Sequence, residues 1–334
     1  MKHNLILTAD WHIRIKPDID EQWQMNRYRQ LTNKVISLCR EHAAILVLAG
    51  DILDRNRPSL PELTLVLELL RKLQNNNIHT LLISGNHESL GQGASTYDFM
   101  GPYLEGLDCI NYNTSQTIFF PCGTLDLYLV GHPALQGYEE SDMREGKVNI
   151  LISHFRPTVN QFIQEEIDVE KFIAPFDYCF AGDIHMPIEL HEGKLISINH
   201  PLNSCFEANP DGSLILVEPA KQGINWSRIP LQLPNLVQKV TAATEFQEPD
   251  EDGNFYRIEV QGSPEELRQC QSERPDLKLL KIPVVGSEFA NLEEPEDKLH
   301  HDFEAGVLSY LQELNLSEER IQQLMAVFRE VDHE

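Results

Sequence analysis

Short clusters of aspartate, histidine and asparagine recur along the first two thirds of this chain of 334 residues. Carboxylate oxygens, amide oxygens and imidazole nitrogens bind divalent metal ions, and two ions held close together can hydrolyse phosphate esters. A lone cluster such as Asp10-Trp11-His12 is more often a structural polar pair, but the clusters together supply enough ligands for one two-metal site. The side chains expected to bind metal are Asp10, His12, Asp51, Asn86, His154, Asp183 and His185.

Each cluster follows or ends a short apolar run that has the length of a buried strand. In an open α/β sheet, the carboxyl ends of the strands form the edge where ligands bind, so these runs predict one site assembled from distant segments. The runs are Leu5–Leu7, Ile45–Leu48, Thr80–Ile83, Ile150–Ile152 and Tyr178–Phe180.

Helical stretches alternate with these strands, which predicts an α/β domain over residues 1–230. The stretches Gln22–Glu41 and Pro61–Gln74 are expected to be helices. Helical spacing in the second stretch places four apolar residues on one face, namely Leu63, Val66, Leu67 and Leu70. After His132 the pattern becomes richer in strands, which predicts a second sheet layered on the first. The added strands are Leu195–Ile198 and Ser213–Val217.

Two smaller units are expected to follow this domain. Residues 231–286 predict a small α+β unit with a strand at Phe255–Val260, a helix at Ser263–Cys270 and a strand at Leu277–Val285. Residues 287–334 hold an acidic linker and then two amphipathic helices, which are too short to fold alone. The helical pair is therefore expected to dock, either on its own chain or on a partner protein.

The charge balance is strongly acidic, with 27 basic and 52 acidic side chains and a net charge of −25. This balance argues against tight nucleic-acid binding by the isolated chain, because phosphate contacts need lysine and arginine. Basic residues do stand beside two of the clusters, and they are the candidate DNA contacts if DNA is the substrate, although solvated loop charges explain them equally well. They are Arg14, Lys16, Arg55 and Arg57.

The cysteines and the apolar runs predict a cytoplasmic protein. The six cysteines are scattered and form no C-x-x-C pair, so they are expected to be reduced. No apolar run approaches the roughly 20 residues that span a membrane, and the first residues do not have the pattern of a signal peptide.

The order of the clusters resembles the calcineurin-like metallophosphoesterase superfamily, whose pattern runs D-x-H, G-D-x-x-D, G-N-H-[DE], H and G-H-x-H. The resemblance covers about residues 5–190 and implies a four-layer αββα sandwich. It implies one metal ion held by Asp10, His12, Asp51 and His185, and a second held by Asp51, Asn86, His154 and Asp183. Asp183 stands where the superfamily usually has histidine. A carboxylate favours a harder ion than zinc, so Mn²⁺ is expected, with Mg²⁺ as the alternative.

The same resemblance gives His87 the catalytic role. It implies that the imidazole faces the scissile phosphate, where it stabilises the developing charge and protonates the leaving oxygen. Asp54 and Glu88, which neighbour the metal ligands in sequence, are expected to fix the loops rather than to bind metal.

Within the superfamily, the chain is most similar to the SbcD-type DNA nuclease subunits and their phage counterparts. The segment Ile196–Glu207, the unit after residue 231 and the terminal helical pair carry this part of the resemblance. It implies a 3′–5′ exonuclease on duplex ends and an endonuclease on single strands, acting in recombination, repair or replication. It also implies that residues 231–286 form a DNA-capping domain, and that the terminal helices bind an SbcC-type coiled-coil ATPase in a bacterial or phage-infected cytoplasm. A homodimer is left open.

Two other functions remain as alternatives. A serine/threonine phosphoprotein phosphatase also carries Gly-Asp-x-x-Asp-Arg and Gly-Asn-His-Glu, although Asn56 replaces the glycine that such enzymes have next. A non-catalytic DNA-end clamp would keep the fold and lose the chemistry at Asp183. It would show no metal-dependent turnover.

Overall fold

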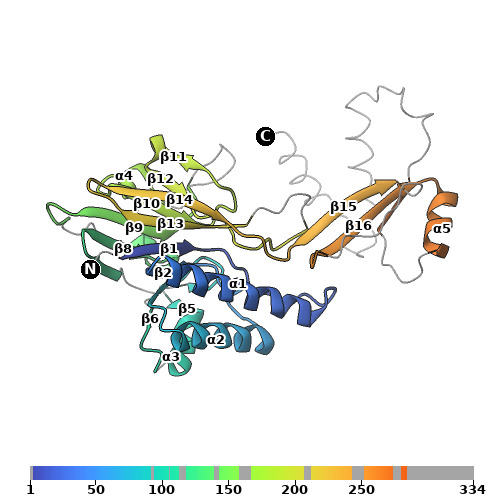
Figure 1. The fold of residues 1–334 in the computed structure, drawn as a ribbon, viewed down its shortest axis with the longest axis horizontal. Helices are drawn as coiled ribbons and strands as arrows, with labels where there is room; N and C mark the ends of the chain where they lie inside the picture. The colour runs from blue at the N-terminus through green and yellow to red at the C-terminus, as the bar shows by residue number, and fades with distance from the viewer. Residues whose placement is uncertain are drawn as a thin grey trace, which may run out of the picture. The chain divides into compact units, whose positions relative to one another are not determined.

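The structure is a computed structural model of the chain, shown in Figure 1. It describes residues 3–91, 94–104, 106–112, 118–138, 143–157, 167–206, 212–242, 252–273 and 280–283. The expected acidic linker and terminal helical pair lie outside these residues.

The first sheet has six strands in the order β14-β13-β1-β2-β3-β6. Strands β1, β2, β3 and β6 are parallel, β13 is antiparallel to β1, and β14 is antiparallel to β13. The carboxyl ends of the parallel strands therefore meet along one edge, as the sequence predicted. The bounds are Asn4–Thr8 (β1), Ala44–Ala49 (β2), Thr80–Ile83 (β3), Ile110–Tyr112 (β6), Ser213–Pro219 (β13) and Ile224–Pro230 (β14).

The second sheet also has six strands, in the order β11-β12-β10-β9-β8-β7. Strands β8, β9, β10 and β12 are parallel, and the two outer strands are antiparallel to their neighbours. The bounds are Ile118–Cys122 (β7), Leu125–Val130 (β8), Val148–His154 (β9), Tyr178–Gly182 (β10), Glu189–Leu190 (β11) and Leu195–Ser197 (β12).

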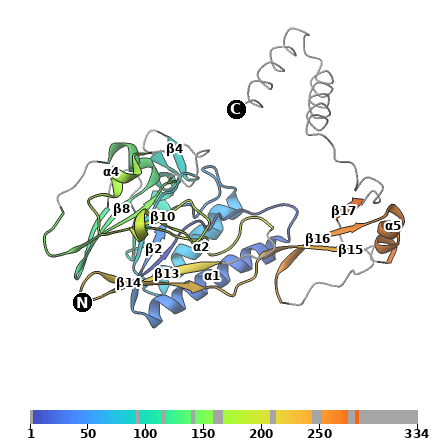
Figure 2. The same ribbon diagram turned by 90° about the horizontal axis from the view of Figure 1, so that it is seen from above.

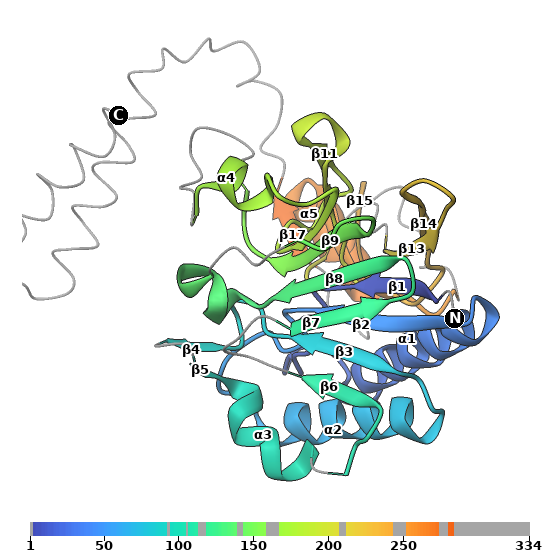
Figure 3. The ribbon, with the colours of Figure 1, turned by 90° about the vertical axis from the view of Figure 1, so that its left-hand side faces the viewer.

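Side-chain alternation along the strands packs the two sheets face to face and covers both outer faces with helices. Leu5 and Leu7 of β1 belong to the apolar cluster that joins the two sheets. Ile6 lies between them and points the other way. It packs in the cluster that includes Leu31 of α1 (Glu21–Glu41) and Leu65 of α2 (Leu60–Asn75). A third cluster packs α4 (Val169–Ile173) on the outer face of the second sheet. The result is the expected αββα sandwich, and Figure 3 shows α1, α2 and α3 (Thr96–Leu104) on one side of the first sheet.

The helices of the outer layers begin at polar residues. Helix α1 (Glu21–Glu41) starts after Asp20, whose carboxylate accepts a hydrogen bond from Trp23 N–H at 2.6 Å. Helix α2 spans Leu60–Asn75, and the shorter helices are α3 (Thr96–Leu104) and α4 (Val169–Ile173). Two 3₁₀ turns lie at His132–Gly137 and His191–Gly193. The two long helices match the predicted ranges within one residue at each end.

The predicted apolar face of α2 was partly wrong. Val66 and Leu70 are buried, but Leu63 and Leu67 are only partly buried. The deeply buried face instead runs through Leu65, Val66, Leu69, Leu70 and Leu73. Leucine stands on more than one side of this helix, so spacing alone did not identify the side that faces the sheet.

The remaining described elements form two small sheets. Strands β4 (Ser89–Gly91) and β5 (Ala94–Ser95) pair as a hairpin. Strands β15 (Leu236–Ala242), β16 (Phe255–Gly262) and β17 (Leu280–Pro283) form a three-stranded sheet, and helix α5 (Pro264–Glu273) lies between β16 and β17 in the chain (Figure 2). Among the described residues, those within 3–241, 252–259 and Leu280 belong to one compact unit, and Ala242, 260–273 and 281–283 belong to a second. The boundary expected at residue 231 stays a prediction.

Two further observations bear on the sequence expectations. The cysteines whose side chains the structure describes, Cys39, Cys109, Cys122, Cys179 and Cys205, are all free. Within the described ranges, no helix is both long and apolar enough to cross a membrane.

Glu62 in the first turn of α2 is a buried carboxylate that ties the helix to two loops. It accepts hydrogen bonds from Ser59 N–H at 2.6 Å and Ile15 N–H at 3.0 Å, and it pairs with Arg55 at 2.8 Å. Burial alone would raise the pKa of Glu62. The hydrogen bonds from Ser59, Arg55 and Ile15 outweigh burial, so the pKa lies below its usual value.

We therefore expect Glu62→Gln to lower the free energy of unfolding by about 1.5–3 kcal/mol at neutral pH, because hydrogen bonds to a charged group are lost. The ionised carboxylate stabilises the fold fully above its usual pKa of 4.5, and this contribution is lost as the pH falls through the lower folded value. Urea denaturation across this range measures the effect. Glu68→Gln on the same helix, which removes only an exposed pair with Arg29, should cost less than about 1 kcal/mol. A difference for Glu62→Gln that persists unchanged in acid would contradict the assignment.

Candidate metal centre

Segments that follow five parallel strands converge on one site. Asp10 follows β1, Asp51 follows β2, and Asn86 follows β3. From the second sheet, His154 ends β9 and Asp183 follows β10. The edges of both sheets thus contribute ligand-type side chains, as the apolar runs predicted.

Asp51 lies at the centre of this cluster. Its side chain is buried, and Oδ2 lies 3.3 Å from His154 Nε2, 3.8 Å from His12 Nε2 and 3.8 Å from His87 Nε2. The other oxygen, Oδ1, accepts a hydrogen bond from His87 N–H at 3.0 Å. One carboxylate oxygen therefore faces three imidazoles that come from different parts of the chain, which is the position that a bridging ligand needs.

Asp10, His12 and His185 form a group whose ligand atoms lie within 4.8 Å of one another. The two Nε2 atoms of His12 and His185 are 3.0 Å apart, and Asp10 Oδ1 lies 3.5 Å from His185 Nε2. Ligand atoms that bind a common ion at about 2.1 Å lie roughly 3 Å apart, so this spacing fits one divalent ion. Asp10, Asp51 and His154 form a second such group.

Two buried atoms near the second group have the character of metal ligands. Asn86 Nδ2 donates to Asp183 Oδ1 at 3.2 Å, while the buried Asn86 Oδ1 accepts no hydrogen bond from any described residue. His154 Nδ1 lies 2.8 Å from the carbonyl oxygen of Ala49. With Nδ1–H donating there, the lone pair of Nε2 faces Asp51 and is available to an ion. The donor set therefore fits two hard divalent ions.

Asp183 differs from the other expected ligands because protein donors already occupy its carboxylate. Arg156 forms a bidentate pair with it at 2.6 and 2.9 Å, and Asn86 donates to the same group. Sequence reasoning missed Arg156, because the only local signal was an arginine two positions after His154. The ligand roles of Asp183 and of the other six residues remain predictions that the geometry accommodates.

Four of these residues have backbone conformations that L-residues rarely adopt. The φ angles are +56° at Asp10, +44° at His12, +51° at Asp51 and +88° at Asp183. Non-glycine residues with positive φ cost about 1–3 kcal/mol each and cluster at functional sites. The packing of the two sheets must therefore fix the backbone at this edge strongly enough to offset the strain.

Gly85 allows the loop after β3 to approach Asp51. A Cβ atom at Gly85 would lie 2.0 Å from Asp51 Oδ1 and 2.5 Å from Asp51 N.

We expect Gly85→Ala to lower the free energy of unfolding by about 1–3 kcal/mol through overpacking and to weaken Mn²⁺ binding at least tenfold. Calorimetric titration and thermal denaturation measure both effects. Gly101→Ala in helix α3, where the nearest atom would be 3.4 Å away, is the matched control. Unchanged Mn²⁺ affinity in Gly85→Ala would show that this approach does not shape the centre.

His87 stands beside the expected ligands with its ring held from behind. Nδ1 lies 2.7 Å from the carbonyl oxygen of Asp54, so an Nδ1–H donor leaves Nε2 directed to the centre. The side chain is 40% exposed, whereas His154 is buried, so His87 borders the open side. His12, Asp54 and His87 also form a group whose ligand atoms lie within 4.8 Å of one another, so the catalytic role of His87 stays a prediction.

Asp54 and Glu88 contact the residues and loops of the centre, and the expectation that Asp54 binds no metal stays a prediction, since it shares a possible ligand group with His12 and His87. Asp54 Oδ1 lies 3.3 Å from His12 Nδ1 on the side of the ring away from Asp51. Glu88 is fully buried and accepts hydrogen bonds from the backbone N–H groups of Asp51, Leu53 and Gly85. The hydroxyl of Tyr97 also donates to Glu88 at 2.9 Å. One carboxylate thus joins the loops after β2 and β3.

The electrostatics of the centre favour cations. Burial alone would lower the pKa of His154, but the charges of Asp51, Asp10 and Asp183 raise it well above its usual value. Burial would raise the pKa of Asp51, but His154 and the other imidazoles hold it well below its usual range. The pKa of His185 is also raised, because Asp10 outweighs the opposing effect of burial. Such an excess of negative charge attracts divalent ions as well as protons.

The four basic residues expected near the site have different surroundings. Arg14 pairs with Asp54 at 3.0 Å, and Lys16 donates to the carbonyl oxygen of Ser204. Arg55 is bound to Glu62, and Arg57 is exposed. Whether any of them contacts DNA stays a prediction.

The fold and the centre define a metallophosphoesterase. The chain matches the calcineurin-like phosphoesterase family over residues 3–187, more than half of its length, and it belongs to that family.

Two known proteins are similar to parts of this chain. The DNA double-strand break repair protein Mre11 of Methanocaldococcus jannaschii is 30% identical over 159 residues, which span 43% of this chain and 41% of that protein. The chain therefore matches less than half the length of this relative. The crystal structure of TT1561 of Thermus thermophilus superimposes with a TM-score of 0.43 at 10% identity, covering 68% of this chain and 99% of that one.

Proposed function

We propose that this protein is a metal-dependent phosphodiesterase that cleaves DNA. The observation that carries the proposal is the position of Asp51, of which one oxygen lies within 3.8 Å of three imidazoles, those of His12, His87 and His154. Such an arrangement suits hydrolysis of a phosphate ester. The similarity to Mre11, a DNA break repair protein, supports DNA as the substrate.

The chain's own residues divide into three roles in this reaction. When bound, two divalent ions would neutralise phosphate charge and lower the pKa of a water molecule. Asp10, His12 and His185 would hold one ion, and Asn86, His154 and Asp183 the other, with Asp51 between them. His87, held through Nδ1, would present Nε2–H to the leaving oxygen and donate a proton to it. Asp54 and Glu88 keep His12 and Asp51 in position.

We also propose the identity of the metal ion, the nuclease activities and the cellular role. Mn²⁺ is the ion we expect, because the expected ligands include several carboxylate oxygens and one amide oxygen. Such ligands suit Mn²⁺ and Mg²⁺ better than Zn²⁺. We further propose 3′–5′ exonuclease activity on duplex ends, endonuclease activity on single strands, and a cytoplasmic role in recombination, repair or replication, as in the SbcD-type subunits and their phage counterparts. The strongly acidic chain needs a partner that supplies much of the DNA-binding surface.

A phosphoprotein phosphatase is less well supported. Arg55 belongs to the motif shared with such enzymes, but its guanidinium is bound to the buried carboxylate of Glu62 at 2.8 Å. It is therefore less available to a phosphomonoester. A direct comparison decides between the two substrates: with Mn²⁺, we expect cleavage of a labelled oligonucleotide and little release of phosphate from a phosphoserine peptide. Dephosphorylation of the peptide with intact DNA would contradict the nuclease proposal.

The partner proposal can be tested by truncation. Deleting residues 291–334 should abolish co-purification with an SbcC-type coiled-coil ATPase, because the expected helical pair lies there. The metal centre lies within residues 10–185, so the truncated chain should keep its Mn²⁺ affinity, measured by calorimetry. Unchanged co-purification after the deletion would refute this role for the terminal segment.

A further inference from the structure

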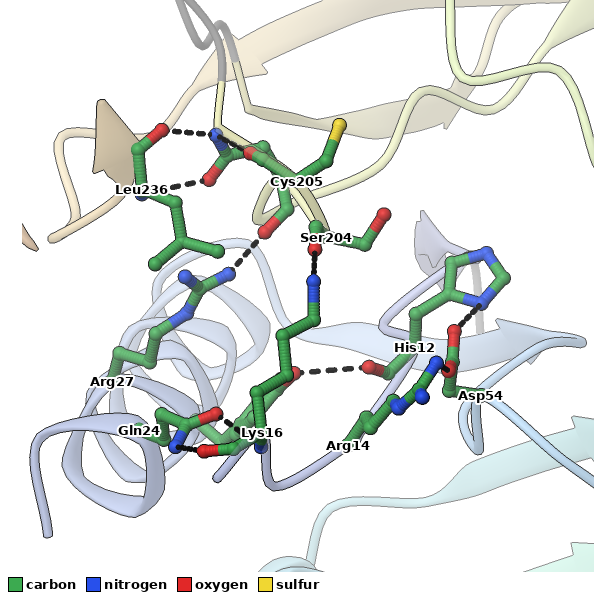
Figure 4. Close-up of a pocket in the computed structure, with 11 residues that line it drawn as sticks. His12, Arg14, Lys16, Gln24, Arg27, Asp54, Ser204, Cys205 and Leu236 are labelled. Carbon is green, nitrogen blue, oxygen red and sulfur yellow. Dashed lines mark hydrogen bonds and ion pairs between the residues drawn. The ribbon is translucent and has the colours of Figure 1, made fainter. Parts of the chain in front are cut away.

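A cavity of about 180 Å³ adjoins the metal centre on the side of His12 and Asp54, which help to line it (Figure 4). Its other walls come from the loop before α1, from α1 itself and from the segment Asn203–Cys205. It is smaller than the roughly 300 Å³ of pockets that enclose whole small molecules, so it suits one chemical group of a larger ligand.

Basic side chains dominate this cavity although the chain as a whole is acidic. Arg14, Lys16 and Arg27 line it, while Asp54, which pairs with Arg14 at 3.0 Å, is the one carboxylate among its described lining residues. The whole chain, by contrast, has 27 basic and 52 acidic side chains. A local excess of positive charge beside an acidic metal centre attracts an anion and excludes a free cation.

Arg27 is the most informative of the three cations. It is buried, and no carboxylate among the described residues is paired with it. Its side chain donates to the carbonyl oxygen of Asn203 and lies 5.3 Å from the Trp23 ring and 5.5 Å from the Tyr28 ring. Its buried Nε has no hydrogen-bond partner among the described residues. Burial lowers the pKa of Arg27, and Tyr28 opposes this only in part. A buried guanidinium that contacts a carbonyl and two rings gains from an incoming anion.

Lys16 and Arg27 are held by neighbouring carbonyl groups of one segment. Lys16 Nζ donates to Ser204 O, as Figure 4 shows, and Arg27 donates to Asn203 O. Each ammonium or guanidinium group keeps further N–H donors beyond that contact. The segment therefore holds two cations that line the same cavity, and its carbonyl groups do not neutralise their charge.

We infer that this cavity is a phosphate subsite, in which Arg14, Lys16 and Arg27 bind the phosphodiester next to the scissile one on the same nucleic-acid strand. The inference rests on the proposed function, since it assumes that a strand enters the metal centre. His12 and Asp54 border both places, so a strand whose scissile phosphate reaches His12 passes this cavity. The subsite would fix the register of the strand, because phosphate contacts position nucleic acid without reading its sequence.

Binding without catalysis tests the subsite directly. We would measure fluorescence anisotropy of a short labelled single-stranded oligonucleotide in the presence of chelator, so that cleavage is suppressed. Lys16→Met and Arg27→Gln should each raise Kd about tenfold, as expected for a lost charge-assisted contact. Each should also reduce the slope of log K against log[salt] by roughly 0.7.

Arg29→Gln is the matched control for both variants. Arg29 lies on the same helix as Arg27 and loses the same charge, but it is bound to Glu68 at 2.7 Å and does not line the cavity. Its Kd and salt slope should equal those of the wild type. Because Arg27 is buried, its loss also costs stability, so the half-buried Lys16 provides the decisive variant.

The exposed thiol of Cys205 gives a readout on the wild-type protein. Cys205 lines the cavity, so saturating oligonucleotide should slow its alkylation by iodoacetamide several-fold, as followed by mass spectrometry. The protection should be weaker in Lys16→Met at the same oligonucleotide concentration.

The outcomes separate the subsite from the proposed function. If Lys16→Met binds oligonucleotide like Arg29→Gln and Cys205 reacts at its free rate, the subsite is overturned, even if the wild type cleaves DNA with Mn²⁺. If binding depends on Lys16 and Arg27 but the wild type cleaves no DNA with any divalent ion, the proposed catalysis fails and the subsite stands.

Discussion

Asp51→Asn is expected to abolish measurable turnover and to leave at most one metal ion weakly bound. The buried Asp51 Oδ2 lies 3.3 Å from His154 Nε2 and 3.8 Å from His12 Nε2, so it contacts one imidazole from each of the two groups of ligands. Replacing one oxygen by an amide removes the charge that two cations would share. Because bound metal ions contribute several kcal/mol to the transition state, kcat should fall by about 10³-fold or more.

Calorimetric titration with Mn²⁺ separates this effect from simple unfolding. The wild type should bind two ions, and Asp51→Asn should bind at most one, weakly. Asp126→Asn is a matched control, since Asp126 is also buried and paired with an arginine, Arg144, but lies in β8. It should lose stability and keep both ions. Two tightly bound ions in Asp51→Asn would show that Asp51 is not shared between them.

His87→Ala is expected to lower kcat by about 10²–10⁴-fold while Mn²⁺ binding is retained. The ring is fixed by Asp54 O at 2.7 Å, and Nε2 of this 40% exposed side chain lies 3.8 Å from Asp51 Oδ2, beside the place where a proton donor for the leaving oxygen is needed. General acid catalysis contributes factors of this size. Steady-state cleavage of a phosphodiester and a parallel Mn²⁺ titration give the two numbers.

The cleavage rate and the Mn²⁺ affinity of His87→Ala together identify the role of His87. If His87 is the proton donor, His87→Ala should lower kcat more than it changes KM, and its affinity for Mn²⁺ should stay within about threefold of the wild type. His191→Ala, at an exposed histidine in the turn after β11, should change neither quantity. If His87→Ala weakens Mn²⁺ binding as strongly as Asp51→Asn does, then His87 is a ligand rather than a catalytic group.

The sequence predicted the fold and the location of the centre because both depend on local patterns. Buried parallel strands are continuous apolar runs, and their carboxyl ends gather ligands at one edge, so the place of Asp10, Asp51 and His154 followed from the chain order. The helices α1 and α2 were predictable for the same reason, except for the face that α2 buries. A helix with leucine on several sides carries no unique signal for that face.

The features that the sequence did not predict depend on contacts between distant segments. Arg156 and Asp183 meet across two neighbouring strands, and nothing in the local sequence of either residue indicates the pair. The left-handed backbone at Asp10 and Asp51 is imposed by the packed sheets against local preference. The burial of Arg27 could not be predicted either, because its guanidinium binds the carbonyl oxygen of Asn203, which lies far along the chain.

Cleavage of end-labelled linear DNA with Mn²⁺, Mg²⁺ or chelator tests the central claim most directly, with duplex and single-stranded substrates and with the coiled-coil ATPase present and absent. We predict that the wild type degrades DNA with Mn²⁺, that chelator stops the reaction, and that Asp51→Asn is inactive under every condition. Intact DNA in every reaction, with two Mn²⁺ ions bound to the wild type, would contradict the nuclease assignment and favour a DNA-end clamp. Degradation that continues in chelator or in Asp51→Asn would contradict the metal centre itself.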